Sequence, residues 1–198
     1  RNRYRYRLRK INLTFNQLPE SFRGLKILQI SDIHSGSFND LEAVSRGVEM
    51  ALSTKPDLIL FTGDLVNNHA EEMTEYLPVF ARLRAPMGVY SILGNHDYGD
   101  YVPWESDQAK AVNLQRLKAM HGHMGWRLLL DEHVVLERNS QRIALIGVEN
   151  ISASHRFHSY GNLKKAYAGS EDLPFKILMS HDPSHWDAET TQHFKDID

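Results

Sequence analysis

The stretch Gly94-Asn95-His96-Asp97 follows directly on the apolar run 89–93 (VYSIL) and places an amide, an imidazole and a carboxylate in one short turn. The apolar run is typical of a buried strand, and Gly94 is typical of the turn that ends it. Polar side chains at the end of a buried strand are held by a rigid scaffold, where catalytic and metal-binding groups are usually found. The turn is therefore a candidate site, although four residues alone do not define one.

Three further apolar runs end in residues of the same chemical kind. The runs and the residues that follow them are 26–31 with Asp32 and His34, 57–62 with Asp64, and 175–180 with His181. Asp32 and His34 are two positions apart, so at a strand end both side chains can reach one cation. The sequence therefore predicts strand ends that deliver oxygen and nitrogen ligands to one edge of a sheet.

The predicted ligands form a borderline donor set, suited to Mn, Fe, Zn, Co or Ni, of which we favour Mn. They are Asp32, His34, Asp64, Asn95 and His181. Five ligands are more than one small cation usually takes, so we expect two divalent metal ions that share Asp64 as a bridge. Two ions about 3.5 to 4 Å apart lower the pKa of a bridging water and clamp a phosphoryl group for in-line attack.

The leaving group of such a reaction needs a proton. His96 follows the predicted ligand Asn95 and precedes Asp97, so it can act as a general acid that a carboxylate orients. We therefore expect His96 and Asp97 to be catalytic. A structural metal site would have no use for a general acid.

Composition limits the class of protein. With 198 residues, of which 41% are hydrophobic, the chain can bury one substantial core. A net charge of -2 predicts no general affinity for polyanions. The absence of cysteine excludes disulfides, thiolate metal sites and a cysteine nucleophile. No apolar run approaches the roughly 18 residues needed to cross a bilayer, and no signal peptide is visible.

The first ten residues, RNRYRYRLRK, are basic and interleaved with tyrosine. They fit a solvated edge strand, and they also fit a juxtamembrane segment whose arginines meet anionic headgroups, with a membrane region before residue 1. Nucleic-acid binding lacks support from the rest of the chain. We expect 1–20 to be a basic juxtamembrane segment and edge strand, with pairing over 11–15, and 21–198 to be the functional domain.

The periodicity of the remaining chain predicts an α/β fold. Helices are expected over 41–52, 71–83 with an interruption at Pro78, 106–120, 162–167 and 186–193. The order of strand, helix, strand over 25–62 favours a parallel pair with a right-handed crossover. Strands over 127–130, 133–137 and 142–148, with a tight turn at Asn139-Ser140, predict a second and more antiparallel sheet.

These blocks resemble the signature of the calcineurin-like metallophosphoesterases: Asp-x-His, Gly-Asp, Gly-Asn-His-Asp and a lone His stand in the family's order over roughly 25–198. The resemblance implies two mixed β-sheets packed face to face with flanking helices. It assigns Asp32 and His34 to the first metal, Asp64 to the bridge, Asn95 and His181 to the second metal, and leaving-group protonation to His96 with Asp97 behind it. Within the family the chain looks most like the membrane-tethered bacterial branch.

Two departures from the family pattern stand out. Many members have Gly-Asp-x-x-Asp, and here the last position is Asn67. The family's Gly-His-x-His block does not follow His181, and His121-Gly122-His123 is no substitute because it precedes His181. We therefore expect a C-terminally incomplete domain in which each metal lacks one histidine, with weak metal binding and low activity for these 198 residues.

The leading hypothesis is a hydrolase of phosphate monoesters or diesters. The alternative is a non-catalytic metal-binding or scaffolding module, membrane-associated in the parent protein. A zinc hydrolase of amides would need a glutamate base near the metals, and the sequence places none there. This chain itself is expected to be soluble, and dense arginine beside a membrane span favours the cytoplasmic face. The oligomeric state does not follow from the sequence.

Specificity is expected from the loops 98–106 and 151–160. An aromatic rim of Trp104, Phe157, His158 and Tyr160 would favour a lipid or another envelope-borne phosphoester. Tyr98 and Tyr101 can contact substrate or pack at the rim. Asp182 is expected to cap the helix that follows it, and His185 either lines the cleft or lies at the surface.

Overall fold

The computed structural model describes residues 3–154 and 157–198, and its strands form two sheets. The first sheet has the order β1-β2-β3-β4, with β1 at Ile27–Ile30, β2 at Leu58–Phe61, β3 at Val89–Ser91 and β4 at Arg127–Leu128. The second has the order β5-β6-β7, with β5 at Glu132–Arg138, β6 at Gln141–Gly147 and β7 at Lys176–Met179.

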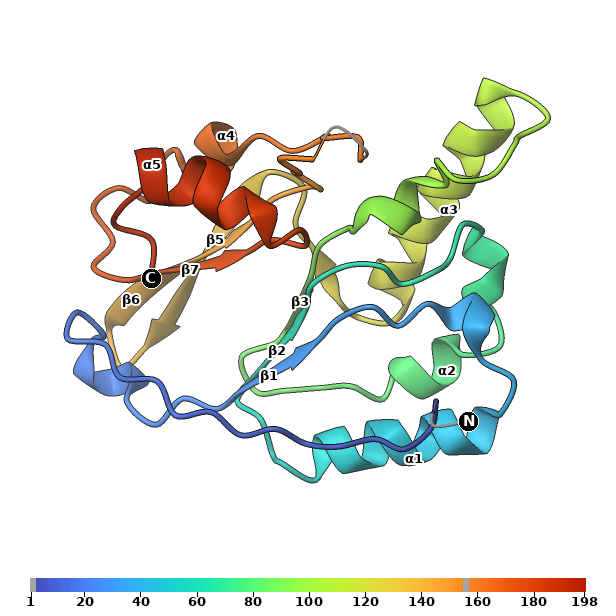
Figure 1. The fold of residues 1–198 in the computed structure, drawn as a ribbon. Helices are drawn as coiled ribbons and strands as arrows, with labels where there is room; N and C mark the ends of the chain where they lie inside the picture. The colour runs from blue at the N-terminus through green and yellow to red at the C-terminus, as the bar shows by residue number, and fades with distance from the viewer. Residues whose placement is uncertain (1–2, 155–156) are drawn as a thin grey trace.

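The α-helices lie outside the two sheets. They are α1 at Leu41–Leu52, α2 at Leu77–Phe80, α3 at Asp107–His123, α4 at Leu163–Tyr167 and α5 at Thr191–His193. In Figure 1, α1 and α2 lie on one side of the strands and α4 and α5 on the opposite side. The shorter turns are 3₁₀ helices at Glu20–Phe22, Ser35–Ser37, Ala70–Met73 and Asn95–Tyr98, and a π turn at Trp186–Thr190.

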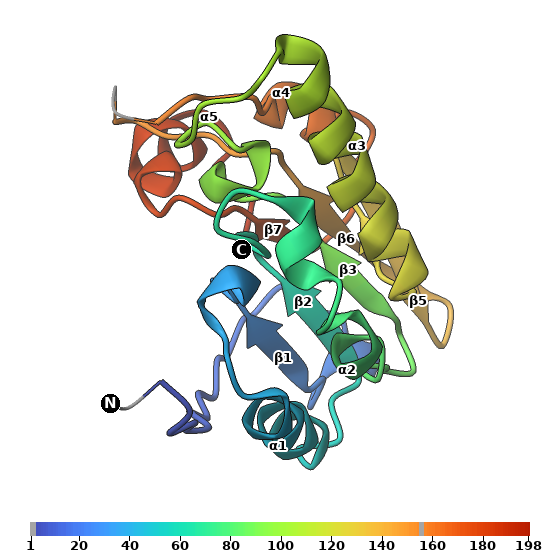
Figure 2. The same ribbon diagram turned by 90° about the vertical axis from the view of Figure 1, so that its right-hand side faces the viewer.

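The alternation of side chains along each central strand explains the layers. In β2, Leu58 and Leu60 point into the core between the sheets, while Ile59 and Phe61 point into the core beneath α1, α2 and α3. β2 is therefore buried on both faces, as its unbroken apolar sequence predicts. Figure 2 shows β1, β2 and β3 side by side, with α1 below β1.

The second sheet follows the same rule. In β6, Ile143 and Leu145 meet the first sheet, while Ala144 and Ile146 pack toward Leu163 of α4. β5 and β6 are antiparallel and joined by Asn139 and Ser140, both with positive φ, which suits a tight hairpin turn. β6 and β7 are parallel. The α/β architecture of two face-to-face sheets with flanking helices is therefore confirmed.

Some details differ from expectation. The first sheet is parallel throughout its described strands, so only the second is mixed. No strand forms over 11–15 in the described chain, and Ile11 and Leu13 are 77% and 71% exposed. Their alternation is therefore not the mark of a paired edge strand. The helix predicted over 71–83 is interrupted near Pro78, which lies in the first turn of the short α2. Within residues 3–154 and 157–198, no helix has both the length and the apolar character to cross a membrane.

Candidate metal centre

The parallel register of the first sheet brings three predicted ligand loops together. Ile30 of β1 pairs with Phe61 of β2, and Phe61 pairs with Ser91 of β3, so the three strands end at one edge. The loops that carry Asp32 and His34, Asp64, and Asn95 begin there. His181 follows β7 in the other sheet, and its Nδ1 lies 2.8 Å from the carbonyl oxygen of Thr62.

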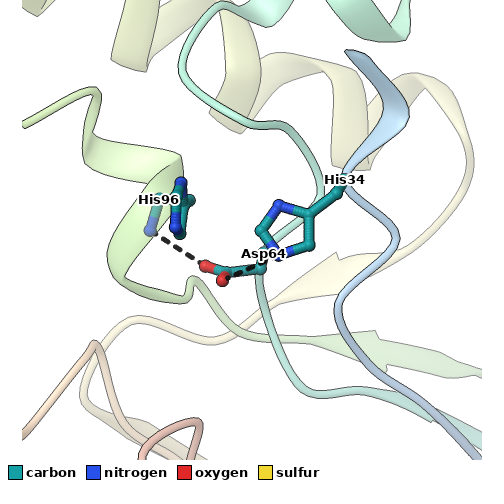
Figure 3. Close-up of side chains that lie close together, drawn as sticks. All are labelled: His34, Asp64 and His96. Carbon is teal, nitrogen blue, oxygen red and sulfur yellow. Dashed lines mark hydrogen bonds and ion pairs between the residues drawn. The ribbon is translucent and has the colours of Figure 1, made fainter. Parts of the chain in front are cut away.

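Asp64 lies at the centre of the cluster. Its side chain is 3% exposed, and its Oδ2 is 3.4 Å from Nε2 of His34 and 3.4 Å from Nε2 of His181. Its Oδ1 accepts a hydrogen bond of 2.9 Å from the backbone amide of His96. Figure 3 shows this carboxylate between the His34 ring and the His96 turn. Asp64 therefore has the position that a bridging ligand requires.

The two remaining predicted ligands join the cluster at its sides. Oδ1 of Asp32 is 3.8 Å from Nε2 of His34, and Oδ1 of Asn95 is 3.1 Å from Nε2 of His181. The structure thus brings all five predicted ligands together.

The geometry fits divalent cations. Two groups share Asp64, one with His34 and His96 and the other with Asp32 and His181, and in each group the donor atoms lie within 4.8 Å of one another. Carboxylate and imidazole donors at this spacing suit Mn, Fe, Zn, Co or Ni. His96 was predicted only as an acid, so its place among these donors is a finding that the sequence did not indicate.

The protonation of the cluster also favours a positive charge beside Asp64. Burial alone would raise the pKa of Asp64, but its hydrogen bond and charge interaction with His181 hold that pKa below its ordinary value. Burial alone would lower the pKa of His181, but the interaction with Asp64 raises it to about 9. A proton on His181 and a bound cation would therefore each stabilise the charged carboxylate of Asp64.

Three ligand residues have a backbone conformation that side chains rarely adopt. The φ angles of Asp32, His34 and Asp64 are 54°, 47° and 61°. Non-glycine residues in this left-handed region cost on the order of 1–3 kcal/mol each and gather at functional sites. Three of the seven such non-glycine residues in the described chain lie at predicted ligand positions, which agrees with a functional centre.

Two glycines let the ligand loops approach one another. A Cβ on Gly63, whose φ is 98°, would lie 2.5 Å from the nitrogen of Gly94 and 2.9 Å from Nδ1 of His181. A Cβ on Gly94 would lie 2.6 Å from the nitrogen of Asp64. The glycines of the Gly-Asp and Gly-Asn-His-Asp blocks are therefore required by packing between the loops.

Asp97 has a different set of contacts from the one expected. It is fully buried, and its carboxylate accepts hydrogen bonds from the amides of Asp64 and Gly94 at 2.9 Å and of Leu65 at 2.8 Å. Burial, together with the charge of Asp64, raises the pKa of Asp97 to about 7 against the opposing effect of these donors. Among the described residues no hydrogen bond joins this carboxylate to the His96 ring. Asp97 joins the loops after β2 and β3 instead.

The orientation of His96 comes from a residue that sequence reasoning did not assign. Nδ1 of His96 lies 2.7 Å from the carbonyl oxygen of Asn67. Glu72 holds that segment, because its carboxylate accepts from the amides of Asn67, Asn68 and His69 at 2.6, 3.0 and 2.9 Å. A glutamate three residues after the N-cap position is one half of a capping box, but the N-cap here is His69 rather than serine or threonine, so the sequence contains only a weak signal for Glu72.

A cavity of about 390 Å³ opens beside the centre. It is lined by Asp32, Asn95, Phe157, His181, Asp182 and Pro183. Phe157 thus fits the predicted rim, whereas Trp104 turns away to donate to the carbonyl of Gly99 at 2.7 Å. Asp182 accepts from the amide of Ser184 at 2.8 Å, as a capping residue does.

His185 lies neither in the cleft nor at the surface. It is fully buried, and its ring nitrogens lie 2.8 Å from Oγ of Ser180 and 3.0 Å from Oε2 of Glu189. Both predictions for this residue were therefore wrong, because one partner before it in the chain and one on the following turn allow a polar ring to be buried.

Two packed sheets with flanking helices and a candidate cation-binding cluster at the strand ends define an α/β fold of the metallophosphoesterase type. A solved structure with this fold, the NAD nucleotidase of Haemophilus influenzae, matches with a TM-score of 0.57 and 17% identity over 88% of this chain and 37% of that one. The chain belongs to the calcineurin-like phosphoesterase family, whose model matches residues 25–197. The predicted family is thus confirmed.

Curated relatives resemble the chain along much of its length. A transmembrane protein with a metallophosphoesterase domain from Danio rerio is 27% identical over 194 residues, which cover 94% of this chain and 41% of that protein. The UDP-2,3-diacylglucosamine pyrophosphatase LpxG of Chlamydia trachomatis is 44% identical over 102 residues, or 48% of this chain and 30% of that protein. The chain therefore spans less than half the length of these two relatives.

Proposed function

We propose that this chain carries the catalytic centre of a phosphoester hydrolase that works with two divalent metal ions. The observation that carries the proposal is the position of Asp64. Its Oδ2 lies 3.4 Å from Nε2 of His34, which follows the first sheet's β1, and 3.4 Å from Nε2 of His181, which follows β7 of the second sheet. Membership in the calcineurin-like phosphoesterase family supports the same reaction class.

The ligand residues divide into two sets around the shared carboxylate. The family resemblance assigns Asp32 and His34 to one cation and Asn95 and His181 to the other, with Asp64 common to both. Asp32 also lies close enough to His181, and His34 to His96, to share an ion. When bound, such a metal pair lowers the pKa of water and neutralises charge on phosphoryl oxygens. Mn is our favoured metal within the borderline group.

His96 would protonate the leaving group. Its Nδ1 lies 2.7 Å from the carbonyl oxygen of Asn67, which can only accept, so Nδ1 keeps its hydrogen. The other nitrogen, Nε2, is then the atom that delivers a proton from the charged ring to an alkoxide. Asn67 and Glu72 hold this orientation, and Asp97 supports it indirectly through the backbone of its loop.

The substrate would be a phosphoester with an apolar portion. Phe157 lines the cavity and is 39% exposed, next to the polar residues Asp32, Asn95 and His181. An exposed aromatic ring beside a phosphate-binding centre favours substrates that bring apolar surface to it. The similarity to LpxG, named for a diacylated sugar nucleotide, agrees with a lipid or another envelope component.

The test of the reaction is hydrolysis of aryl phosphomonoesters and diesters with added Mn²⁺. Because low activity is expected of these 198 residues, we expect slow metal-dependent turnover, which falls about 100-fold or more in His96→Ala, the usual loss when a general acid is removed. His193→Ala is the matched control, because His193 is exposed on α5. Uptake of Mn²⁺ without any hydrolysis would instead support the non-catalytic metal-binding module.

The basic N-terminal segment would place this centre at an anionic membrane surface, on the cytoplasmic face. Arg5, Arg7, Arg9 and Lys10 are exposed, and Leu8 beside them is 42% exposed. Each basic residue near such a surface contributes on the order of 1 kcal/mol.

Sedimentation with vesicles tests this association. The chain should bind phosphatidylserine-containing vesicles at low salt, and a triple variant, Arg5→Glu with Arg7→Glu and Arg9→Glu, should not. Equal sedimentation of both proteins, or binding to neutral vesicles alone, would contradict the electrostatic explanation.

A further inference from the structure

Tyr101 contacts two residues of the metal centre. Its hydroxyl accepts a hydrogen bond of 2.7 Å from Nδ2 of Asn95. Its ring lies against the His96 ring, with centroids 4.6 Å apart and planes at 46°. The side chain is 43% exposed, so it contributes little to the hydrophobic core. These contacts place Tyr101 at the centre without making it part of the scaffold.

The two residues before Tyr101, Gly99 and Asp100, are both held by contacts with other parts of the structure. Gly99 has φ 68°, and its carbonyl accepts from Nε1 of Trp104 at 2.7 Å. The Asp100 carboxylate accepts from the Tyr160 hydroxyl at 2.7 Å and pairs with Lys110 of α3. Contacts from α3 and from the loop before α4 thus fix the position of Tyr101.

The Asn95 side chain can bind a cation in only one of its two amide orientations, whereas a carboxylate can bind a cation in either. Only the oxygen of its amide can bind a cation, whereas the NH₂ group is a donor without a free lone pair. In the structure Oδ1 faces His181, with Nε2 at 3.1 Å, and Nδ2 faces away from it. With Oδ1 on the metal side, Nδ2 needs an acceptor, and among the described residues that acceptor is Tyr101.

We propose that Tyr101 is a positioning residue that holds the Asn95 amide with its oxygen toward the metal centre. The inference rests on the proposed function, because it concerns the second metal of that centre. A group that orients a metal ligand typically changes metal affinity by about 10- to 100-fold when it is removed. Here the partner is an exposed neutral hydroxyl, so the lower end of that range is expected.

The experiment is titration calorimetry of the 198-residue chain with Mn²⁺ alone. Tyr101→Phe should weaken one of the two binding events about tenfold, equivalent to about 1.4 kcal/mol, and leave the other unchanged. The matched control is Tyr167→Phe, which removes a hydroxyl that donates to Asp196 at 2.7 Å at the end of α4. The control should bind Mn²⁺ as the parent chain does.

An Asn95→Asp background separates positioning from general loss of structure. A carboxylate presents an oxygen in either orientation, so it needs no partner for an NH₂ group. The Tyr101 hydroxyl can still donate to the outer oxygen of this carboxylate, so in this background Tyr101→Phe should weaken Mn²⁺ binding by clearly less than the roughly tenfold expected beside Asn95. A purely structural role of Tyr101 would weaken binding equally in both backgrounds.

The outcomes distinguish the two proposals. Mn²⁺ binding that Tyr101→Phe leaves unchanged, or weakens equally beside Asn95 and beside its aspartate replacement, would overturn the role of Tyr101 and leave the metal centre intact. No binding of Mn²⁺ by the parent chain would overturn the metal centre and this inference with it. Circular dichroism with equal unfolding midpoints confirms that the compared variants are folded.

Discussion

The variant Asp97→Asn removes one of the acceptors that join the loops after β2 and β3. The carboxylate is fully buried and accepts from backbone amides through both oxygens. Oδ2 accepts from Asp64 and Gly94, and Oδ1 accepts from Leu65 and Val66. Asparagine has the same shape but replaces one oxygen with an NH₂ group that cannot accept.

The structure sets the expected loss of stability. Whichever way the new amide turns, two of the four backbone donors lose their acceptor and face another donor. A buried donor without a partner costs roughly 1–3 kcal/mol, so the two together cost roughly 2–6 kcal/mol. Removal of a buried negative charge beside Asp64 offsets part of this. We therefore expect the free energy of unfolding to fall by about 2–4 kcal/mol.

Urea unfolding at pH 8, above the pKa of about 7 for Asp97, measures this loss as a shift of the midpoint at unchanged slope. The control is Asp172→Asn, an exposed position where a change within about 0.5 kcal/mol is expected. A loss in Asp97→Asn no larger than in the control, with a large fall in turnover, would refute the reasoning. Asp97 would then act on His96 in catalysis rather than on the loop backbone.

Two further predictions test other parts of the structure. His121 is fully buried, and burial lowers its pKa from 6.5 to about 3. Between these two pH values the unfolded chain binds a proton at His121 that the folded chain does not bind. Stability conferred by neutral His121 should therefore be lost as pH falls below about 6.5, by about 2–3 kcal/mol at pH 4.5. In His121→Gln the loss over the same range, followed by urea unfolding, should be smaller by that amount, and an identical pH dependence would contradict the assignment. Gly94→Ala should be destabilising and abolish Mn²⁺ binding, because its Cβ would lie 2.6 Å from the nitrogen of Asp64. Gly122→Ala, with no neighbour within 4 Å in α3, should instead gain up to about 1 kcal/mol, and equal effects of the two alanines would contradict the packing argument.

The sequence was sufficient to predict the layers and the convergence of the candidate ligand residues. The unbroken apolar run of β2 indicated burial on both faces, and its alternating residues do enter two different cores. Because the parallel strands β1, β2 and β3 end at one edge, ligands placed after each strand had to converge. Asp64 could be assigned to the centre from this reasoning alone.

Periodicity failed where the chain makes few tertiary contacts. The residues over 11–15 alternate as in a strand, but Ile11 and Leu13 are exposed. A strand also requires a neighbouring strand with free backbone groups, and alternation alone does not provide one. Sequence pattern describes which side chains could be buried. It does not supply the partner that buries them.

Contacts across distant loops were the other limit. Asp97 is adjacent to His96 in sequence, yet its carboxylate binds amides of the loop after β2, and the His96 ring contacts Asn67 instead. The hydrogen bond between Asn95 and Tyr101 depends on a loop that Asp100 holds in place. Side-chain direction in such turns follows from backbone angles that spacing does not reveal.

The amino-acid sequence by itself indicated the α/β class, the succession of strands along the chain and a set of candidate metal ligands, because these depend on apolar runs and on residue types at strand ends. Only the tertiary structure decided which atoms of those residues face one another. It placed Asp32, His34 and Asp64 in left-handed backbone conformations. It also separated the structural role of Asp97 from the orientation of His96, since both depend on loops brought together by the packed sheets.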